Sequence, residues 1–222
     1  PAAEGLGGAR QMMADGLFET FPVDEIYGMH NSPNGKPGTF DICKGVAMAG
    51  AMFFAAHIRG LGSHAAMPHQ SRDTVVIAST LVSQLQTIVS RNVAPLDSCV
   101  MSVTQIHAGA AYNVVPENAH IAGTVRYFRE EVCNLAMQRM QAICDGIAAA
   151  YEVEINLDMR NVFDVLVNDH ELSDAYIDAA TDILGAENVS DISVPATGSE
   201  DFDDILRDVP GAYCRVGHTG TT

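Results

Sequence analysis

Several features that identify common classes of protein are missing from this sequence of 222 residues. No apolar run reaches the roughly 18 residues that a transmembrane helix needs, and no basic segment followed by an apolar one marks a secretory leader. Lysine and arginine are scarce: they number 12 against 28 aspartates and glutamates, which gives a net charge of −16. Because nucleic acids and anionic membranes attract basic surfaces, we expect neither as a partner.

The sequence also lacks the short motifs of several enzyme classes. It contains no G-x-S-x-G, no phosphate-binding P-loop and no dinucleotide-binding fingerprint, so the chemistries of those motifs are not predicted. Its five cysteines are an odd number without a C-x-x-C pair. That usage is typical of a reducing cytosol, so we expect a cytoplasmic protein. Cys133 and Cys144 lie in a helical pattern and are expected to be small core residues.

Hydrophobic residues make up 47% of the chain, enough for a packed core, and their spacing predicts one domain inserted into another. Residues 52–158 have a β-α-β-β-α-β pattern, the split βαβ order of a ferredoxin-like α+β fold, with two helices on one face of an antiparallel sheet. Residues 1–51 and 159–222 are then two parts of an incomplete α/β domain. The inserted strands are predicted at 52–59, 98–107, 118–128 and 153–158, and the inserted helices at 73–91 and 130–151.

The termini of some helices can also be predicted. Asp73 is the expected N-cap of the helix at 73–91. In "ATGSEDFDD", Ser199 is expected to cap the helix that follows, with Glu200 and Asp201 near the positive end of its dipole. The elements predicted in the flanks are a helix at 9–17, a strand from Ile26 that ends at His30 and Asn31, helices at about 170–184 and 200–207, and a strand at 211–217.

Two residues of the first flank have the side chains of a metal site. Glu4 lies in a glycine-rich turn, and His30 ends a predicted buried strand. Carboxylate oxygen and imidazole nitrogen are ligands that hard-to-borderline divalent cations accept. The alternative at this stage is structural: a carboxylate at a helix N-terminus, and a hydrogen-bonded histidine at a strand end.

Three side chains of the inserted segment are further candidates. His64 is placed at the apex of "GLGSHAAMPH", where it suits a general acid/base or an electrophile, or merely braces the loop. Asn113 can offer its amide to an oxyanion, and Arg126 can offer a planar fork to a carboxylate. A turn asparagine and a surface ion pair are the structural alternatives. The histidines that lack partners at ligand spacing, and are assigned no role, are His57, His107, His120, His170 and His218.

Six stretches of the chain, taken in order, carry a resemblance to a known family. They are "PAAEGLGGARQMMADGLFE", "GMHNSPNGKPGTF", "GLGSHAAMPHQSRDTV", "QLQTIVSRNVAPLDS", "VTQIHAGAAYNVVPENAHIAGTVR" and "GSEDFDDIL…VPGAY". Together they resemble the bacterial amidohydrolases that include hippurate hydrolase and the N-acyl-amino-acid amidohydrolases. These enzymes belong to the aminoacylase and carboxypeptidase group of two-metal peptidases, and the resemblance covers essentially the whole chain.

The resemblance implies an α/β catalytic domain interrupted by a ferredoxin-like lid, through which the protein forms a homodimer. It implies that Glu4 and His30 bind two divalent metal ions (zinc, manganese, cobalt or nickel). Metal-activated water then cleaves the amide bond of a hippurate-like N-acyl amino acid or a short peptide. His64 is implied to reach a neighbouring subunit's active site and steady the oxyanion, with Asn113 in the same region. Arg126 is implied to bind the substrate's free carboxylate.

The chain departs from the family's usual pattern at one informative position. Relatives usually have two adjacent acids, as in P-A-E-E-G, of which the first is the general base and the second a ligand; here the pair is Ala3-Glu4. The family's remaining ligands would lie before Pro1 and beyond Thr222. We therefore expect this chain to be inactive or impaired. The alternatives are a non-catalytic homologue that binds N-acyl amino acids or peptides through Arg126, and a dimerisation module formed by the lid.

Overall fold

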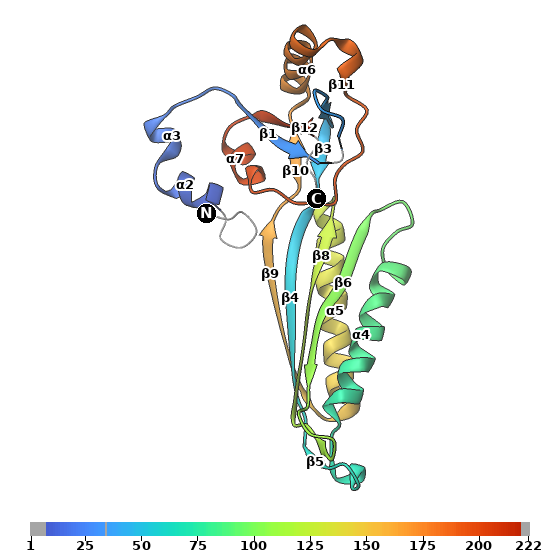
Figure 1. The fold of residues 1–222 in the computed structure, drawn as a ribbon. Coiled ribbons are helices and arrows are strands. Elements are labelled where there is room, and N and C mark those ends of the chain that lie inside the picture. Colours follow the sequence, from blue (N-terminus) through green and yellow to red (C-terminus); the bar gives the residue numbers. More distant parts are fainter. Residues whose placement is uncertain (1–7, 34, 219–222) are drawn as a thin grey trace. The chain divides into compact units, whose positions relative to one another are not determined.

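The computed structural model describes residues 8–33 and 35–218, which divide into two compact units (Figure 1). The first unit is drawn from residues 1–50 and 162–222, and the second from residues 51–161. Among the helices described, none combines the length and apolar character needed to cross a membrane. The functional assignment of the units, as catalytic domain and lid, stays a prediction.

The first unit is built on short strands from both flanks. They are β1 (Ile26–Ser32), β2 (Phe40–Ile42), β3 (Gly45–Met48), β10 (Leu166–Asn168), β11 (Val189–Ser190) and β12 (Gly211–Gly217). A mixed sheet has the order β1-β12-β2-β11, and β10 pairs with β3 separately. β1 is parallel to β12, so the first and last strands of this unit are neighbours.

The helices of this unit are α2 (Gly8–Ala14), α3 (Leu17–Thr20), α6 (His170–Leu184) and α7 (Phe202–Asp208). The single helix predicted at 9–17 is wrong, because the chain turns at Gly16, whose φ of 86° is left-handed and suits glycine. Asp169 caps α6 by accepting a hydrogen bond from the Leu172 amide. A core cluster formed by α6, β2 and β12 contains Phe40, Ile42, Ala180, Ala212 and Cys214.

The second unit has the predicted order of elements. These are β4 (Gly50–Arg59), β5 (Ser63–His64), the 3₁₀ turn η1 (Pro68–Gln70), α4 (Thr74–Arg91), β6 (Cys99–Ala108), β7 (Val114–Val115), β8 (Asn118–Tyr127), α5 (Glu130–Tyr151) and β9 (Glu154–Phe163). Its main sheet has the order β6-β8-β4-β9, which is the split βαβ arrangement. β5 and β7, which are far apart in sequence, pair antiparallel as a separate two-stranded sheet that we call the β5–β7 pair. The predicted topology is therefore confirmed, whereas the role of lid is not tested by it.

Local sequence signals explain much of this unit. The Asp73 carboxylate accepts hydrogen bonds from the Val75 and Val76 amides, as expected of the N-cap of α4. Cys133 and Cys144 are buried, as predicted. β9 is longer than predicted and continues to Phe163, with outward and partly buried side chains alternating along most of its length.

Candidate functional site

The middle of β1 is shaped by a close approach of an aromatic ring to the backbone. Gly28 is paired with Tyr213 of β12, and a Cβ added at Gly28 would lie 2.6 Å from the Tyr213 ring. His30, two residues further along the same strand, projects from the same face as that missing Cβ. The absence of a side chain at Gly28 therefore lets the Tyr213 ring lie over β1 on the face from which His30 projects.

His30 is oriented so that one ring nitrogen is occupied and the other is available. Its Nδ1 lies 2.6 Å from the Asn31 carbonyl oxygen, which can only accept, so Nδ1 carries the proton. In the neutral ring Nε2 then holds a lone pair, and it lies 4.0 Å from Oε2 of Glu200. The His30 side chain is 58% exposed, whereas that of Glu200 is 17% exposed. A backbone carbonyl bound to Nδ1–H is the usual support of a histidine that binds metal through Nε2.

Glu200 is held from its other side by Tyr213. The Tyr213 hydroxyl donates to Oε2 of Glu200 over 2.9 Å, and burial, followed by the nearby Glu200 charge, raises the pKa of Tyr213. The tyrosine therefore keeps its proton and stays a donor. Its backbone is fixed by the buried Asn168, which accepts from the Tyr213 amide (2.8 Å) and donates to the Tyr213 carbonyl (3.0 Å). His30, Glu200 and Tyr213 thus form one connected polar array.

The residues next to Glu200 anchor the beginning of the described chain. The Asp201 carboxylate accepts a hydrogen bond from the Ala9 amide over 2.9 Å, and Arg10 pairs with Asp204 at 2.7 Å. Asp203 is 2% exposed, and burial, with a smaller contribution from Asp204, raises its pKa to about 7. These contacts place the N-terminus of α2 against the segment that carries Glu200.

The structure corrects the prediction for this segment. Ser199 does not cap α7: its hydroxyl is buried and has no hydrogen-bond partner among the described residues. Glu200 lies before α7 and faces His30, a role that the sequence did not reveal because the two residues come from opposite flanks. Ala3 and Glu4 lie outside the described residues.

We expect Gly28→Ala to destabilise the protein. The new methyl group would collide with the Tyr213 ring, and such overpacking costs about 1–3 kcal/mol in the free energy of unfolding. Gly146→Ala in α5 is the matched control, because a Cβ there meets nothing within 4 Å and alanine favours a helix by about 0.5–1 kcal/mol. Urea unfolding of both variants checks the prediction, which fails if Gly28→Ala is as stable as the unmodified chain.

His64 and Asn113 meet in the second unit, at the β5–β7 pair. His64 is paired with Val114, and the Asn113 carbonyl accepts from the Ala65 amide over 2.9 Å. The Ala66 amide donates to Nδ1 of His64 over 3.1 Å, so the neutral ring carries its proton on Nε2. His64 therefore presents an exposed N–H donor, the opposite tautomer to that of His30.

Arg126 lies in the main sheet of the same unit, at the end of β8 away from β5 and β7. Arg126 is the last residue but one of β8. Near it, the Thr124 hydroxyl donates to the Met52 carbonyl, so this end of β8 lies beside the start of β4. Asn118, at the opposite end of β8, is eight residues away, which corresponds to roughly 27 Å of strand. Arg126 also donates to the Thr124 hydroxyl, and burial lowers its pKa from the usual value. Within one copy of this unit, Arg126 and the β5–β7 pair that carries His64 (Figure 1) are therefore far apart.

Comparison with known proteins places these features in a family. The whole chain, residues 1–222, matches the family described as peptidase family M20/M25/M40. It is 39% identical to a hippurate hydrolase of Campylobacter jejuni over 202 residues, covering 91% of this chain and 53% of that protein. It is 37% identical to an N-acetyl-L-cysteine deacetylase of Bacillus subtilis over 220 residues, covering 99% and 52%. The chain thus spans about half the length of the curated relatives it matches.

Solved structures give the same assignment. A putative aminohydrolase from methicillin-resistant Staphylococcus aureus aligns with a TM-score of 0.82 and 26% identity, covering 94% of this chain and 54% of that one. A dinuclear metal-binding peptidase of the M20 family from Bacillus subtilis aligns with a TM-score of 0.78 and 27% identity, covering 100% and 55%. The chain therefore belongs to peptidase family M20/M25/M40.

Proposed function

We propose that the protein is a metal-dependent amidohydrolase that cleaves the amide bond of N-acyl amino acids. The observation that carries this proposal is the polar array on β1, where His30 offers Nε2 beside the Glu200 carboxylate. Relatives named hippurate hydrolase and N-acetyl-L-cysteine deacetylase support the substrate class. The shared chemistry of those names is a free amino acid joined to an acyl group.

The residues around His30 fit a divalent metal ion by their donor chemistry. An imidazole with Nδ1–H bound to a carbonyl, next to a carboxylate, provides donors that zinc, manganese, cobalt and nickel accept. Within the described ranges, no group of three or more His, Cys, Asp or Glu side chains is arranged to hold a metal, so we propose that Glu4 contributes to the same site. When bound, divalent ions supply Lewis-acid polarisation of the amide carbonyl and activation of water.

The protein's own groups then have separate roles. His64, as an Nε2–H donor, suits the stabilisation of negative charge on the carbonyl oxygen of the amide. Asn113 lies beside it at the β5–β7 pair. Arg126 offers a charged, planar fork to the amino acid's carboxylate. His30 does not share the role of His64, because in its neutral tautomer Nδ1, and not Nε2, is the donor.

The distance between His64 and Arg126 supports a homodimer. A substrate the size of an N-acyl amino acid cannot touch both ends of one sheet that spans roughly 27 Å. We propose that a second copy supplies His64 and Asn113 to the substrate whose carboxylate is bound by the first copy's Arg126. The exposed edge strand β6 of the order β6-β8-β4-β9 is available for pairing between copies.

A second candidate function is favoured by Ala3. If the general base is missing, the protein can still recognise N-acyl amino acids through Arg126 without turning them over. The two candidates make different predictions for catalysis and the same prediction for binding.

A substrate panel with metal removal tests the proposed function. We expect the full-length protein to release amine from hippurate and N-acetyl amino acids slowly, to stop after treatment with a chelator, and to recover when zinc or manganese is restored. Hydrolysis that continues in strong chelator would contradict the metal-dependent mechanism. Calorimetric binding of these compounds without any hydrolysis, lost in Arg126→Ala, would favour the binding protein instead.

A further inference from the structure

Arg126 is a half-buried cation that forms no ion pair with the acids of the described chain. Burial lowers its pKa, and no neighbouring carboxylate counteracts that effect. The protein is rich in acids, with 28 against 12 lysines and arginines, and the arginines that do pair with them are Arg10, Arg59, Arg72, Arg129 and Arg207. Because a partly buried charge is costly without a partner, an unpaired Arg126 is suited to an anionic ligand.

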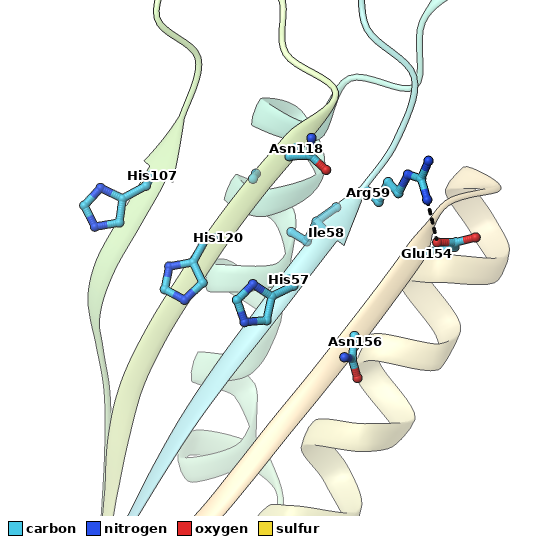
Figure 2. Close-up of a pocket in the computed structure, with 9 residues that line it drawn as sticks. His57, Ile58, Arg59, His107, Asn118, His120, Glu154 and Asn156 are labelled. Atoms are coloured by element: carbon cyan, nitrogen blue, oxygen red, sulfur yellow. Dashed lines mark ion pairs between the residues drawn. The ribbon is translucent and has the colours of Figure 1, made fainter. Parts of the chain in front are cut away.

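Arg126 projects from the face of the sheet that the helices leave uncovered. Ile121 and Val125 of β8 are buried, and the alternate residues, which include His120, Thr124 and Arg126, are partly exposed. Figure 2 shows His120, earlier on the same strand, on the side of the sheet away from the helices. Side chains that are an even number of residues apart along a strand share a face, so Thr124 and Arg126 lie together on this open face.

The Thr124 hydroxyl ties the Arg126 side chain to the backbone of the neighbouring strand. Nη1 of Arg126 donates to the Thr124 hydroxyl oxygen, and the same hydroxyl donates to the Met52 carbonyl of β4 over 3.3 Å. A guanidinium can only donate and a carbonyl can only accept, so the hydroxyl uses both of its capacities to connect them. Because Thr124 is β-branched, rotation about its χ1 is restricted, and the position of the hydroxyl is well defined.

The contacts of Arg126 leave one edge of its guanidinium available. The two hydrogen bonds that the structure gives this side chain, to the Thr124 hydroxyl and to the Val125 carbonyl (3.4 Å), both use Nη1. Nη1 is the nitrogen on the Cδ side of the guanidinium, so Nε and Nη2 form the opposite edge. Two parallel N–H groups on one edge match the two oxygens of a carboxylate.

We propose that Thr124 is a positioning residue, which holds Nη1 of Arg126 so that the Nε–Nη2 edge binds the free carboxylate of an N-acyl amino acid. This inference rests on the proposed function and adds the residue that orients its carboxylate-binding group. A carboxylate bound at this edge accepts two charge-assisted hydrogen bonds. The corresponding carboxamide is uncharged, and its NH₂ group would face an N–H donor. Thr124 therefore contributes to the selection of substrates with a free carboxyl group.

Calorimetric binding of hippurate and of its carboxamide, hippuramide, to the full-length protein tests this inference. We expect the unmodified protein to prefer the acid. Thr124→Val keeps a similar shape without the hydroxyl and should reduce this preference by about tenfold, because a hydrogen bond to a charged group contributes on that scale. Affinity for the amide should change little, whereas general damage to the fold would weaken both ligands. Thr124→Ser restores the hydroxyl and should retain most of the preference.

Ser102→Ala is the matched control, with metal content kept equal in all proteins. Ser102 of β6 is paired directly with Thr124, so this variant removes a neighbouring hydroxyl and should keep the preference for the acid. A preference that is lost in Arg126→Ala but kept in Thr124→Val would overturn the positioning role and leave the proposed function standing. Equal binding of acid and amide by the unmodified protein would contradict the proposed role of Arg126, and this inference with it.

Discussion

Ala3→Glu is expected to raise the turnover number for N-acyl amino acid hydrolysis by about 10²- to 10⁴-fold. The reason is the role that the resemblance implies for position 3, a carboxylate that deprotonates water, and general acid–base catalysis contributes a factor of that size. The rate is measured with hippurate in the full-length protein under saturating metal. The gain should appear mainly in kcat, because the new carboxylate acts on water rather than on the substrate.

Ala3→Gln separates the chemistry from the shape. Glutamine has nearly the size of glutamate but is not a base, so we expect Ala3→Gln to leave the rate near that of the unmodified protein. Equal rates for Ala3→Glu and Ala3→Gln would show that position 3 does not supply the general base. Bound metal is quantified in all three proteins, so that a change in metal content is not mistaken for a change in catalysis.

Two inactive variants are expected to restore each other's activity when they are co-expressed in the Ala3→Glu background. His30→Ala damages the site on the first unit, whereas His64→Ala damages the β5–β7 pair, which we propose acts on the partner copy. In a mixed dimer, the copy with an intact His30 meets a partner with an intact His64. About a quarter of the activity of the Ala3→Glu protein should return. Random assembly makes half of the dimers mixed, and each mixed dimer contains one complete site out of two.

His30→Ala combined with Glu200→Gln is the control for this experiment. Both substitutions change the same array on the first unit, so every site in a mixed dimer is damaged and no activity should return. If co-expression of His30→Ala with His64→Ala also restores no activity, although the mixed dimer forms, the β5–β7 pair does not act across subunits.

The sequence predicted the inserted unit well because its signals are local. Asp73 stands at the start of a clear helix, and the alternating strands follow one another within a single stretch. The first unit was harder to predict: β2 and β3 were missed because strands of only three and four residues leave no periodic pattern. Gly16 ended a helix that the hydrophobic pattern alone would have continued.

The candidate site was predictable only in part, for a geometric reason. Residue type and position marked His30 and His64, but their tautomers depend on the Asn31 carbonyl and the Ala66 amide, which only the fold brings into place. Glu200 resembled an ordinary acid near a helix N-terminus. The pairing of His107 with His120 could not be predicted for the same reason, since cross-strand neighbours have no fixed spacing in sequence.

The pairing of β1 with β12 also has a consequence for the order of folding. These strands come from opposite sides of the inserted residues 51–161, so the array of His30 and Glu200 cannot assemble until the insertion and the segment that follows it, through β12, have been synthesised. The inserted unit is continuous and can fold as it emerges from the ribosome. Its first and last strands, β4 and β9, are neighbours in one sheet. Once it has folded, the long loop between β1 and β12 is shortened, and the entropic cost of closing it falls.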